Sequence, residues 1–499
     1  MGTVLKRTVR PWPSRPACFV KLEKGVRYED GTLKQWGHEA SLKFVLEIAR
    51  DCKIVYLVGG WDGASMPVTE WFIAPEGWER VVYHRDPLIA VYKHEDGRKV
   101  TLYSTAQWFG KCENASLCRS AYVRLRELLR SSFDRGVDLL GTPARTGLDL
   151  LERSLPCNKD GVPYEYPVLD ADLREMIEHN MGQGRMEFLR EGGTGSYRPE
   201  KLYVLDANWM YAACLHTLPA LPIEHRVATI SDGIEAVDLD LYRCGIYRVN
   251  FNIPENWHNI GLLPVWDKEL KRTVYPEKGT NTWDHVWFPF ESIVGEAELR
   301  LAVEQKWPLM IKECWLFADE KANNARPARK WSTTLRTLRE ACKDEREGLL
   351  GPLLRSALRA LLIKAIGGFH RRGRVEQVET PHERAEEVDP MGILEVTPTT
   401  IRWERPIAID PHMAAFQHPE WSAIVWSRAR ARLARAALEV GHNLIGLRTD
   451  ALLLSNDPHW EDDGKPGTFR LKEVIPLNGK PVPHDEVSYR KLLREVKNG

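Results

Sequence analysis

Two apolar segments far apart in the chain each carry one aspartate at the edge of a predicted strand. KLYVLDANWMYAACL (201–215) predicts a strand that ends at Asp206. NLIGLRTDALLLSN (443–456) predicts two strands joined at a polar turn that contains Asp450. An acidic residue at a hairpin turn is often there only because its side chain stabilises the turn. A Thr-Asp pair between two such apolar runs is also compatible with a functional site. We therefore expect a sheet that presents two carboxylates.

Arginine-bearing helices are predicted between these two segments. GLLGPLLRSALRALLIKAIGGF (348–369) has apolar residues every three or four positions, with Arg355 and Arg359 one turn apart. Its Gly-Gly pair predicts the end of the helix. WSAIVWSRARARLARAALEVGHN (421–443) predicts a second amphipathic helix that leads directly into the Asp450 segment.

This order of elements suits phosphoryl transfer from a nucleoside triphosphate. That reaction uses two divalent ions about 3.5–4 Å apart, which bridge the attacking and leaving oxygens. Magnesium prefers one or two carboxylates together with waters and substrate phosphates. Arginines on one helix face supply cations to the triphosphate. The chain has 70 acidic residues, so two aspartates alone establish nothing, and the hypothesis depends on their order with the helices.

The charge distribution leaves room for a local basic surface. Lysine plus arginine (70) equals aspartate plus glutamate (70), which argues against a protein that coats nucleic acid by charge alone. Residues 321–374 contain 14 Lys/Arg and four acids, and residues 375–390 reverse the sign with six acids and one arginine. Such runs are commonly solvated faces, but arginine also favours phosphate binding.

Length and composition indicate an ordinary protein of several domains. At 499 residues, two to four domains are expected. No apolar run reaches the roughly 20 residues of a membrane helix, and the N-terminus lacks the apolar region of a signal peptide. The nine cysteines include no CxxC pair, which disfavours a disulfide scaffold or a zinc site. We expect a cytoplasmic protein without a membrane partner.

The motifs resemble family B DNA polymerases, specifically the protein-primed branch of phages and linear plasmids. DANWMYA (206–212) matches the aspartate and tyrosine of motif A, DxxSLYP. RALLIKAIGGF (359–369) resembles motif B, KxxxNSxYGxF, with Arg359 in place of the lysine and without the asparagine and tyrosine. GLRTDA (446–451) keeps the Thr-Asp of motif C, YxDTDS, with Arg448 in place of its first aspartate.

The resemblance implies roles for individual residues. Asp206 and Asp450 would be the catalytic pair that binds Mg²⁺ or Mn²⁺. Tyr211 would stack under the incoming sugar and exclude a 2′-hydroxyl. Arg359, supplemented by Arg336, would contact the phosphates of the dNTP.

Weaker similarities extend over most of the chain. MGQGRMEF resembles the YxGG(R) linker that touches the template, which implies DNA contacts by Gly182, Gly184 and Arg185. RKWSTTLR (329–336) resembles the start of the fingers. GTFRLKE resembles the element after motif C, where Lys472 would approach the primer terminus.

The N-terminal region is expected to be an α/β domain. KIVYLVGG (53–60) and RKVTLYST (98–105) predict strands, and AYVRLRELLRSSF (121–133) predicts a helix. A turn-rich stretch, LLGTPARTG, is expected to lead into the next region. The resemblance implies an RNase H-like 3′–5′ exonuclease fold here.

The nuclease itself is expected to have decayed. Relatives use four carboxylates, whereas here only Glu23 and Asp62 fall at matching places. Lys21 stands where the first aspartate would be, and no aspartate occurs near LCRSAYVRL (117–125). A fixed positive charge in a two-metal site repels the cations it needs.

The expected fold class is therefore α/β and α+β multidomain: an exonuclease-like domain, then a polymerase palm, fingers and a reduced thumb. In residue numbers, we expect an exonuclease-like domain at 1–150 and a polymerase domain at 151–499, with motif A at 206–212, an insertion within 213–328, fingers at 329–369, a second insertion at about 370–410, palm with motif C at 411–464 and a thumb-like tail at 465–499.

The resulting hypothesis is a DNA-directed DNA polymerase that lacks proofreading, in a bacterial or archaeal host cell and of phage or plasmid type. Its expected partners are primer-template DNA, dNTPs, and a terminal protein or a processivity partner. Three alternatives stay open: a catalytically silent relative that binds nucleic acid or terminal protein as a scaffold, an untemplated or protein-primed nucleotidyltransferase, and an unrelated α/β protein with chance matches.

Overall fold

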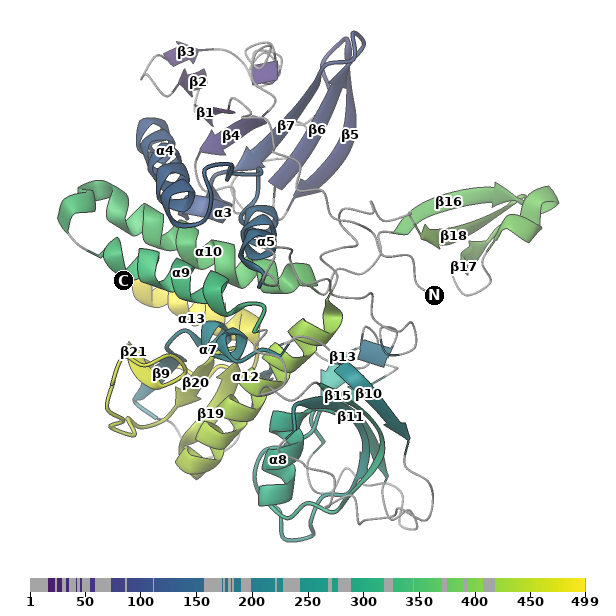
Figure 1. Cartoon of the computed structure of the whole chain (residues 1–499), viewed down its shortest axis with the longest axis vertical. Coiled ribbons are helices and arrows are strands. Elements are labelled where there is room, and N and C mark those ends of the chain that lie inside the picture. Colours follow the sequence, from purple (N-terminus) through teal and green to yellow (C-terminus); the bar gives the residue numbers. More distant parts are fainter. Residues whose placement is uncertain are drawn as a thin grey trace. The chain divides into compact units, whose positions relative to one another are not determined.

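The protein forms two compact units, and each is considered by itself (Figure 1). Unit 1 comprises Met1–Glu165, Leu215–Thr217 and Ala325–Gly367, and unit 2 comprises Tyr166–Cys214, Leu218–Asn324 and Gly368–Gly499. The computed structural model describes residues 17–22, 25–28, 33–35, 42, 45–46, 54–58, 73–85, 88–110, 112–156, 173, 176–177, 181, 184–189, 199–219, 222–227, 243–267, 272–276, 289–317, 326–343, 345–369, 375–388, 393–406 and 418–498.

Unit 1 contains a seven-stranded mixed sheet of order β3-β2-β1-β4-β7-β6-β5. Strands β1, β4 and β7 pair in parallel and the others pair antiparallel. All five residues of β4 are buried, as expected for a strand covered on both faces. The strands predicted within 53–60 and 98–105 are confirmed. The strands are β1 (Ala17–Leu22), β2 (Gly25–Tyr28), β3 (Leu33–Gln35), β4 (Ile54–Val58), β5 (Trp78–Arg85), β6 (Leu88–His94) and β7 (Lys99–Ser104).

Helices complete unit 1. Helix α4 packs against β1 and β2 and begins at the side chain of Asn114, which accepts a hydrogen bond from the amide of Leu117 at 3.0 Å. Helix α5 begins at Thr142 and packs against α9. The helical elements are α3 (Ala106–Phe109), α4 (Ala115–Ser132), α5 (Pro143–Ser154), α9 (Arg329–Ala341), η3 (Glu345–Leu350) and α10 (Gly351–Phe369).

Two expectations about these helices were wrong. The turn-rich stretch before residue 150 is the cap and first turns of α5, so a domain boundary at 150 would cut a helix. Helix α10 does not end at Gly367 and Gly368 but continues to Phe369. A glycine costs a helix only about 1 kcal/mol. The Phe369 ring is buried and meets Trp421 edge-on at 5.7 Å between centroids, and this packing outweighs that cost.

Unit 2 is built around a five-stranded sheet of order β21-β9-β20-β19-β8. Helix α12 lies against β19 and β20, and α13 packs on β21. The predicted strand before Asp206 and the predicted hairpin before and after Asp450 are confirmed. The elements are β8 (Met186–Phe188), β9 (Lys201–Ala207), α7 (Met210–His216), α12 (Pro419–Val440), η6 (Gly441–Asn443), β19 (Leu444–Arg448), β20 (Ala451–Leu454), β21 (Phe469–Pro476) and α13 (Glu486–Asn498).

The C-terminal residues do not project as a separate tail. Strand β21 is an edge strand of the five-stranded sheet. Tyr489 and Leu492 of α13 share a buried core with Leu202, Val204 and Leu453 of that sheet. The stretch expected to be a thumb-like tail is therefore part of the body of unit 2.

Three further sheets belong to unit 2, one of them the antiparallel pair β12-β13. A four-stranded sheet of order β10-β15-β11-β14 adjoins α8, and a three-stranded antiparallel sheet of order β16-β18-β17 has its own small core of Val388, Ile401 and Trp403. Their elements are β10 (Pro222–Val227), β11 (Gly245–Phe251), β12 (Val265–Asp267), β13 (Arg272–Val274), β14 (Phe290–Gly295), α8 (Glu296–Glu304), β15 (Leu309–Phe317), β16 (Val375–Pro381), η4 (His382–Glu387), β17 (Ile393–Val396) and β18 (Thr400–Pro406).

Helix α12 is more buried than its arginines suggested. Arg430 is 2% exposed and forms a bidentate pair with Glu298 of α8, at 2.7 Å and 2.9 Å. The Nε of Arg428 donates to Glu296 of α8 at 2.6 Å. The arginines therefore join α12 to α8 inside unit 2, which the amphipathic pattern did not predict.

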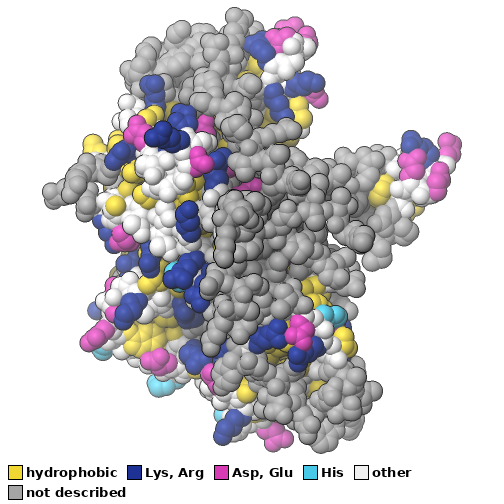
Figure 2. Space-filling model, viewed as in Figure 1, with side chains coloured by type: hydrophobic (Ala, Val, Ile, Leu, Met, Phe, Trp, Pro, Cys, Tyr) yellow, Lys and Arg dark blue, Asp and Glu magenta, His cyan; other side chains and the backbone are white. Residues whose placement is uncertain are grey.

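Charge of both signs is mixed on the surface. On the face drawn in Figure 2, the described Lys and Arg side chains alternate with Asp and Glu, in keeping with 70 residues of each class in the chain. Within the described part of the chain, no helix is long and apolar enough to span a bilayer.

Gly147 and Gly367 offer a matched test of the packing in unit 1. A Cβ on Gly147 of α5 would overlap the carbonyl oxygen of Leu361 in α10, whereas a Cβ on Gly367 of α10 meets nothing within 4 Å. We expect Gly147→Ala to destabilise the protein by about 1–3 kcal/mol through overpacking. Gly367→Ala should instead stabilise it by about 0.5–1 kcal/mol. Chemical denaturation of both variants measures the difference, and equal stabilities would contradict the packing of α5 on α10.

Candidate functional site

Backbone pairing brings the two predicted aspartates to neighbouring strands. Asp206 on β9 lies opposite Ala451 of β20 on one side and Arg470 of β21 on the other. The amide of Ala207 donates to the carbonyl of Asp450 at 2.8 Å. Asp206 and Asp450 therefore stand at the same end of adjacent strands.

The two aspartates are each close to a residue in a strained backbone conformation. Thr449 has φ 55°, and Trp209, between β9 and α7, has φ 50°. Non-glycine residues in this region cost about 1–3 kcal/mol and concentrate at functional sites. Thr449 donates its hydroxyl to Asp450 Oδ1 at 3.0 Å, and its amide donates to the carbonyl of Arg185 at 2.7 Å. These bonds hold the turn that presents Asp450.

Lys472 reaches Asp206 because of a bulge in β21. The pairing of β21 with β9 shifts register between Leu471 and Glu473, which leaves Lys472 as the extra residue. Such bulges redirect side chains beside active sites. The Nζ of Lys472 donates to Asp206 Oδ1 at 3.1 Å, and Asp206 is largely buried. The carboxylate of Asp206 thus faces a positive charge supplied by the chain.

Tyr211 lies on α7 beside the Asp450 turn. Burial raises the pKa of Tyr211 above its usual value, and the negative charge of Asp450 adds to the rise. A Cβ on Gly184 would lie 3.4 Å from both the Tyr211 hydroxyl and Thr449 Cγ2. Gly184 therefore packs closely against the two residues that adjoin Asp450.

Arg185 is an internal residue of this site. It is 2% exposed, its Nε donates to Glu187 at 2.8 Å, and its guanidinium lies 3.8 Å from the centre of the Tyr275 ring. A phosphate contact, as predicted for Arg185, would require it to leave these partners. Gly182, predicted with it, lies outside the described residues.

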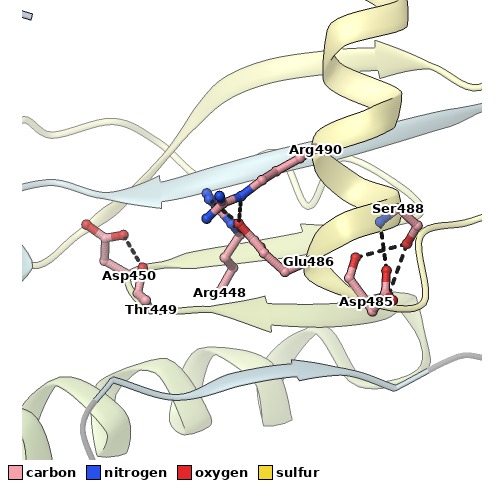
Figure 3. A network of polar contacts seen from close by, with 7 residues as sticks. All are labelled: Arg448, Thr449, Asp450, Asp485, Glu486, Ser488 and Arg490. Carbon is pink, nitrogen blue, oxygen red and sulfur yellow. Dashed lines mark hydrogen bonds and ion pairs between the residues drawn. The ribbon is translucent and has the colours of Figure 1, made fainter. Parts of the chain in front are cut away.

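Arg448 turns away from Asp450 and binds α13 (Figure 3). Its Nε and Nη2 donate to the two carboxylate oxygens of Glu486 at 2.8 Å and 2.9 Å. Its guanidinium also lies 5.0 Å from the centre of the Tyr489 ring. The hydrogen bond from Arg448 lowers the pKa of Glu486 below its usual value, and Arg490 adds a second one. Arg448, expected from sequence to stand in place of an aspartate, therefore holds helix α13.

The predicted phosphate-binding arginines lie in unit 1. Arg359 is exposed on α10, and Arg336 is half-buried on α9. The pKa of His216 is lowered first by burial and then by the charges of Arg329, Arg326 and Arg336. These arginines therefore gather around His216, which follows the Tyr211 segment in the chain.

A divalent metal would find two carboxylates at the Asp206–Asp450 edge. Among the residues that the structure describes, no group of three or more His, Cys, Asp or Glu is placed to hold a metal. Magnesium commonly takes one or two carboxylates and completes its shell with waters and substrate phosphates. Lys472 now pairs with Asp206, one of these two carboxylates. Two carboxylates would suit a metal whose remaining ligands are waters and the phosphates of a substrate.

The N-terminal nuclease motifs are only partly visible. Lys21 lies in β1, paired with Val58 of β4. Glu23 and Asp62 lie outside the described residues. Helix α4, which packs on β1, contains no aspartate.

Sequence reasoning missed Tyr275, Glu187 and Glu486, which support the site. Glu187 lies in the MGQGRMEF stretch, whereas Tyr275 and Glu486 lie in segments without a motif. Tyr275 and Glu486 are far in sequence from Arg185 and Arg448, so spacing along the chain does not reveal these contacts.

The fold resembles that of a known polymerase. Over 95% of this chain and 90% of the other, the structure matches Phi29 DNA polymerase complexed with primer-template DNA, with TM-score 0.52 and 11% identity. It also matches the orthorhombic crystal form of Phi29 DNA polymerase over 92% and 85%, with TM-score 0.53 and 12% identity. A ternary complex of the same enzyme with DNA and incoming nucleotides matches with TM-score 0.53 and 11% identity. No family model and no curated protein matches the sequence. The chain has the fold of this DNA polymerase.

Arg448 gives a test of how α13 is attached. We expect Arg448→Ala to lower the free energy of unfolding by about 1–2 kcal/mol, through loss of a charge-assisted bidentate pair and a cation–π contact. Arg490→Ala is the control, because its bond to Glu486 is more exposed. It should cost less, within the usual range of about 0–1 kcal/mol for exposed pairs.

The effect of Arg448 should depend on pH. The folded-state pKa of Glu486 is lowered, so the contribution of the pair is fully present above the unfolded value of about 4.3. It is lost as pH falls through the folded pKa. Denaturation of both proteins at pH 7 and at acid pH measures this, and a pH-independent difference would contradict the pairing.

Proposed function

We propose that this protein is a DNA-directed DNA polymerase, with Asp206 and Asp450 as its catalytic carboxylates. The observation that carries the proposal is their position at one end of neighbouring strands, in a chain whose fold matches a DNA polymerase. The alternative of a silent scaffold has less support. A scaffold has no need of two aspartates beside strained turns, although loss of the first motif C aspartate leaves that outcome for experiment.

Asp206 and Asp450 would hold Mg²⁺ or Mn²⁺ together with the phosphates of the nucleotide. The metal, when bound, offsets the charge that develops on the triphosphate. Lys472, whose ammonium lies against Asp206, would then find its next partner in the DNA near the primer terminus. Such a shift keeps the charge of the site balanced.

The motif resemblance assigns further residues to the nucleotide. Arg336, in the arginine group around His216, and the exposed Arg359 would contact the phosphates. Arginine suits this role because its fork of donors matches phosphate oxygens. Tyr211, backed by Gly184, would stack under the sugar and exclude a 2′-hydroxyl.

The N-terminal unit would be an exonuclease-like domain without nuclease activity. Its mixed sheet and the helix α4 on β1 support the domain type, and the absence of aspartate in α4 supports the loss of activity. A terminal protein or a processivity factor would serve as partner, with the insertion within 213–328 as a candidate contact. These roles extend the proposal and depend on it.

Neutralising either aspartate tests the function. Asp206→Asn and Asp450→Asn should each lower templated dNTP incorporation by at least about 10²–10³-fold, since each removes an electrostatic stabiliser of the reaction. Glu439→Gln, an exposed acid late in α12, is the matched control and should keep full activity. Primer extension with Mg²⁺ or Mn²⁺, with and without template, gives the measurement.

Three outcomes of that assay separate the alternatives. Incorporation without template would favour an untemplated transferase. No incorporation by the wild type would favour a scaffold. Activity that survives Asp206→Asn would overturn the site. The same reactions without dNTPs should leave a 3′-labelled strand intact, as expected without proofreading.

Tyr211 tests the sugar contact. We expect Tyr211→Val to use ribonucleotides more readily, because the ring that excludes the 2′-hydroxyl is gone. Tyr211→Phe keeps the ring and should discriminate as the wild type does. The ratio of kcat/KM for dNTP and rNTP measures the effect. Equal use of both by the wild type would remove this role and favour RNA synthesis.

A further inference from the structure

Arg185 joins the Asp450 turn to a distant part of the chain. Its carbonyl accepts the amide hydrogen of Thr449 at 2.7 Å, next to Asp450. Its guanidinium, at the other end, lies 3.8 Å from the centre of the Tyr275 ring and is held by Glu187. Because Arg185 is 2% exposed, both ends are fixed inside unit 2.

The contact with Tyr275 depends on the ring rather than on hydrogen bonds. The Tyr275 hydroxyl and Arg185 Nη1 are buried, and neither has a hydrogen-bond partner among the residues that the structure describes. A guanidinium over an aromatic face is attracted by the ring itself. Close packing at Gly261, where a Cβ would lie 3.0 Å from Tyr275 Cβ and 2.6 Å from the carbonyl oxygen of Pro276, fixes the ring.

The turn needs this support because its backbone is strained. Thr449 has φ 55°, and its amide donates to the carbonyl of Arg185. On the other side of the turn, the carbonyl of Asp450 accepts from the amide of Ala207. Gly184, next to Arg185, packs against both Thr449 and the Tyr211 hydroxyl. A displacement of Arg185 would therefore move Asp450 and Tyr211 together.

We propose that Arg185 is a positioning residue for the catalytic turn, and that Tyr275 sets its position. The insertion that carries Tyr275 is thereby coupled to the site through one side chain. This inference rests on the proposed function. It differs from the DNA contact expected for Arg185 from sequence, since the guanidinium binds protein groups.

Tyr275→Phe and Tyr275→Leu form the matched pair for its test. Phenylalanine keeps the ring and removes only a hydroxyl that has no partner, whereas leucine removes the aromatic face. In the full chain, we expect Tyr275→Leu to lower kcat about tenfold or more, because small displacements of catalytic groups are costly. The KM for dNTP should change less than kcat. Tyr275→Phe should match the wild type.

Two further measurements separate positioning from stability and from DNA binding. Mn²⁺ binding, followed by electron paramagnetic resonance, should weaken in Tyr275→Leu and not in Tyr275→Phe. Primer-template affinity, followed by fluorescence anisotropy, should stay unchanged in both. If Tyr275→Leu fails to fold, Arg185→Lys takes its place in the test. Lysine keeps the charge toward Glu187 but loses the planar face, so this variant should show the same loss in kcat and Mn²⁺ binding.

Several outcomes would overturn the inference. Equal kcat and Mn²⁺ binding in the phenylalanine and leucine variants would show that the ring does not position the turn. A lower DNA affinity in Arg185→Lys, with kcat and Mn²⁺ binding unchanged, would show that Arg185 binds phosphate through its forked guanidinium instead. A wild type that incorporates no nucleotide would overturn the proposed function, and the inference with it. An active wild type with unaffected variants would overturn the inference alone.

Discussion

The pairing of β9 between β20 and β21 sets the register on which the site depends. Because side chains alternate between the two faces of a sheet, a slip of one residue would move Asp206 to the opposite face. The apolar residues around it prevent that slip, since Leu202 and Val204 share a buried core with Leu453 and α13. The same register places Arg448, Ala451 and Asp206 in one row across neighbouring strands. Ala451 belongs to this buried core, which thus fixes the positions of Arg448 and Asp206 on either side of it.

In unit 2, several charged side chains hold elements of the fold together. Arg448 holds α13 through Glu486, Arg185 joins the Asp450 turn to Tyr275, and Arg430 joins α12 to α8 through Glu298. The pair of Arg430 with Glu298 is buried, and buried pairs contribute modestly to stability because desolvation offsets much of their attraction. Removing one partner is nevertheless costly, since it leaves a buried charge unpaired. Such pairs therefore constrain which elements meet more than they stabilise the fold.

Around Asp206 and Asp450, strained backbone conformations are accompanied by hydrogen bonds and an ion pair that stabilise them. Thr449 and Trp209 occupy a left-handed region that ordinary residues avoid, and the amide of Thr449 is bonded to Arg185 in return. Lys472 balances the charge of Asp206 through a bulge that breaks the regular pairing of β21. Thr449, Trp209 and the bulge in β21 thus all adjoin one of the two aspartates, although other left-handed residues, such as Lys306 and Asn478, lie elsewhere in the described residues.

The sequence by itself determined the local elements and their order. Apolar runs with a single polar interruption are unambiguous, so the strand before Asp206 and the hairpin at Asp450 followed from pattern alone. The tertiary structure decided where long or chemically ambiguous side chains go. Helix α10 runs through two glycines because Phe369 is buried against Trp421, and the C-terminal residues join the sheet because Tyr489 and Leu492 complete its core. Arg185 and Arg448 have the same formal charge as any surface arginine. Only partners distant in sequence, Tyr275 and Glu486, make them internal supports, and spacing along the chain carries no record of such contacts.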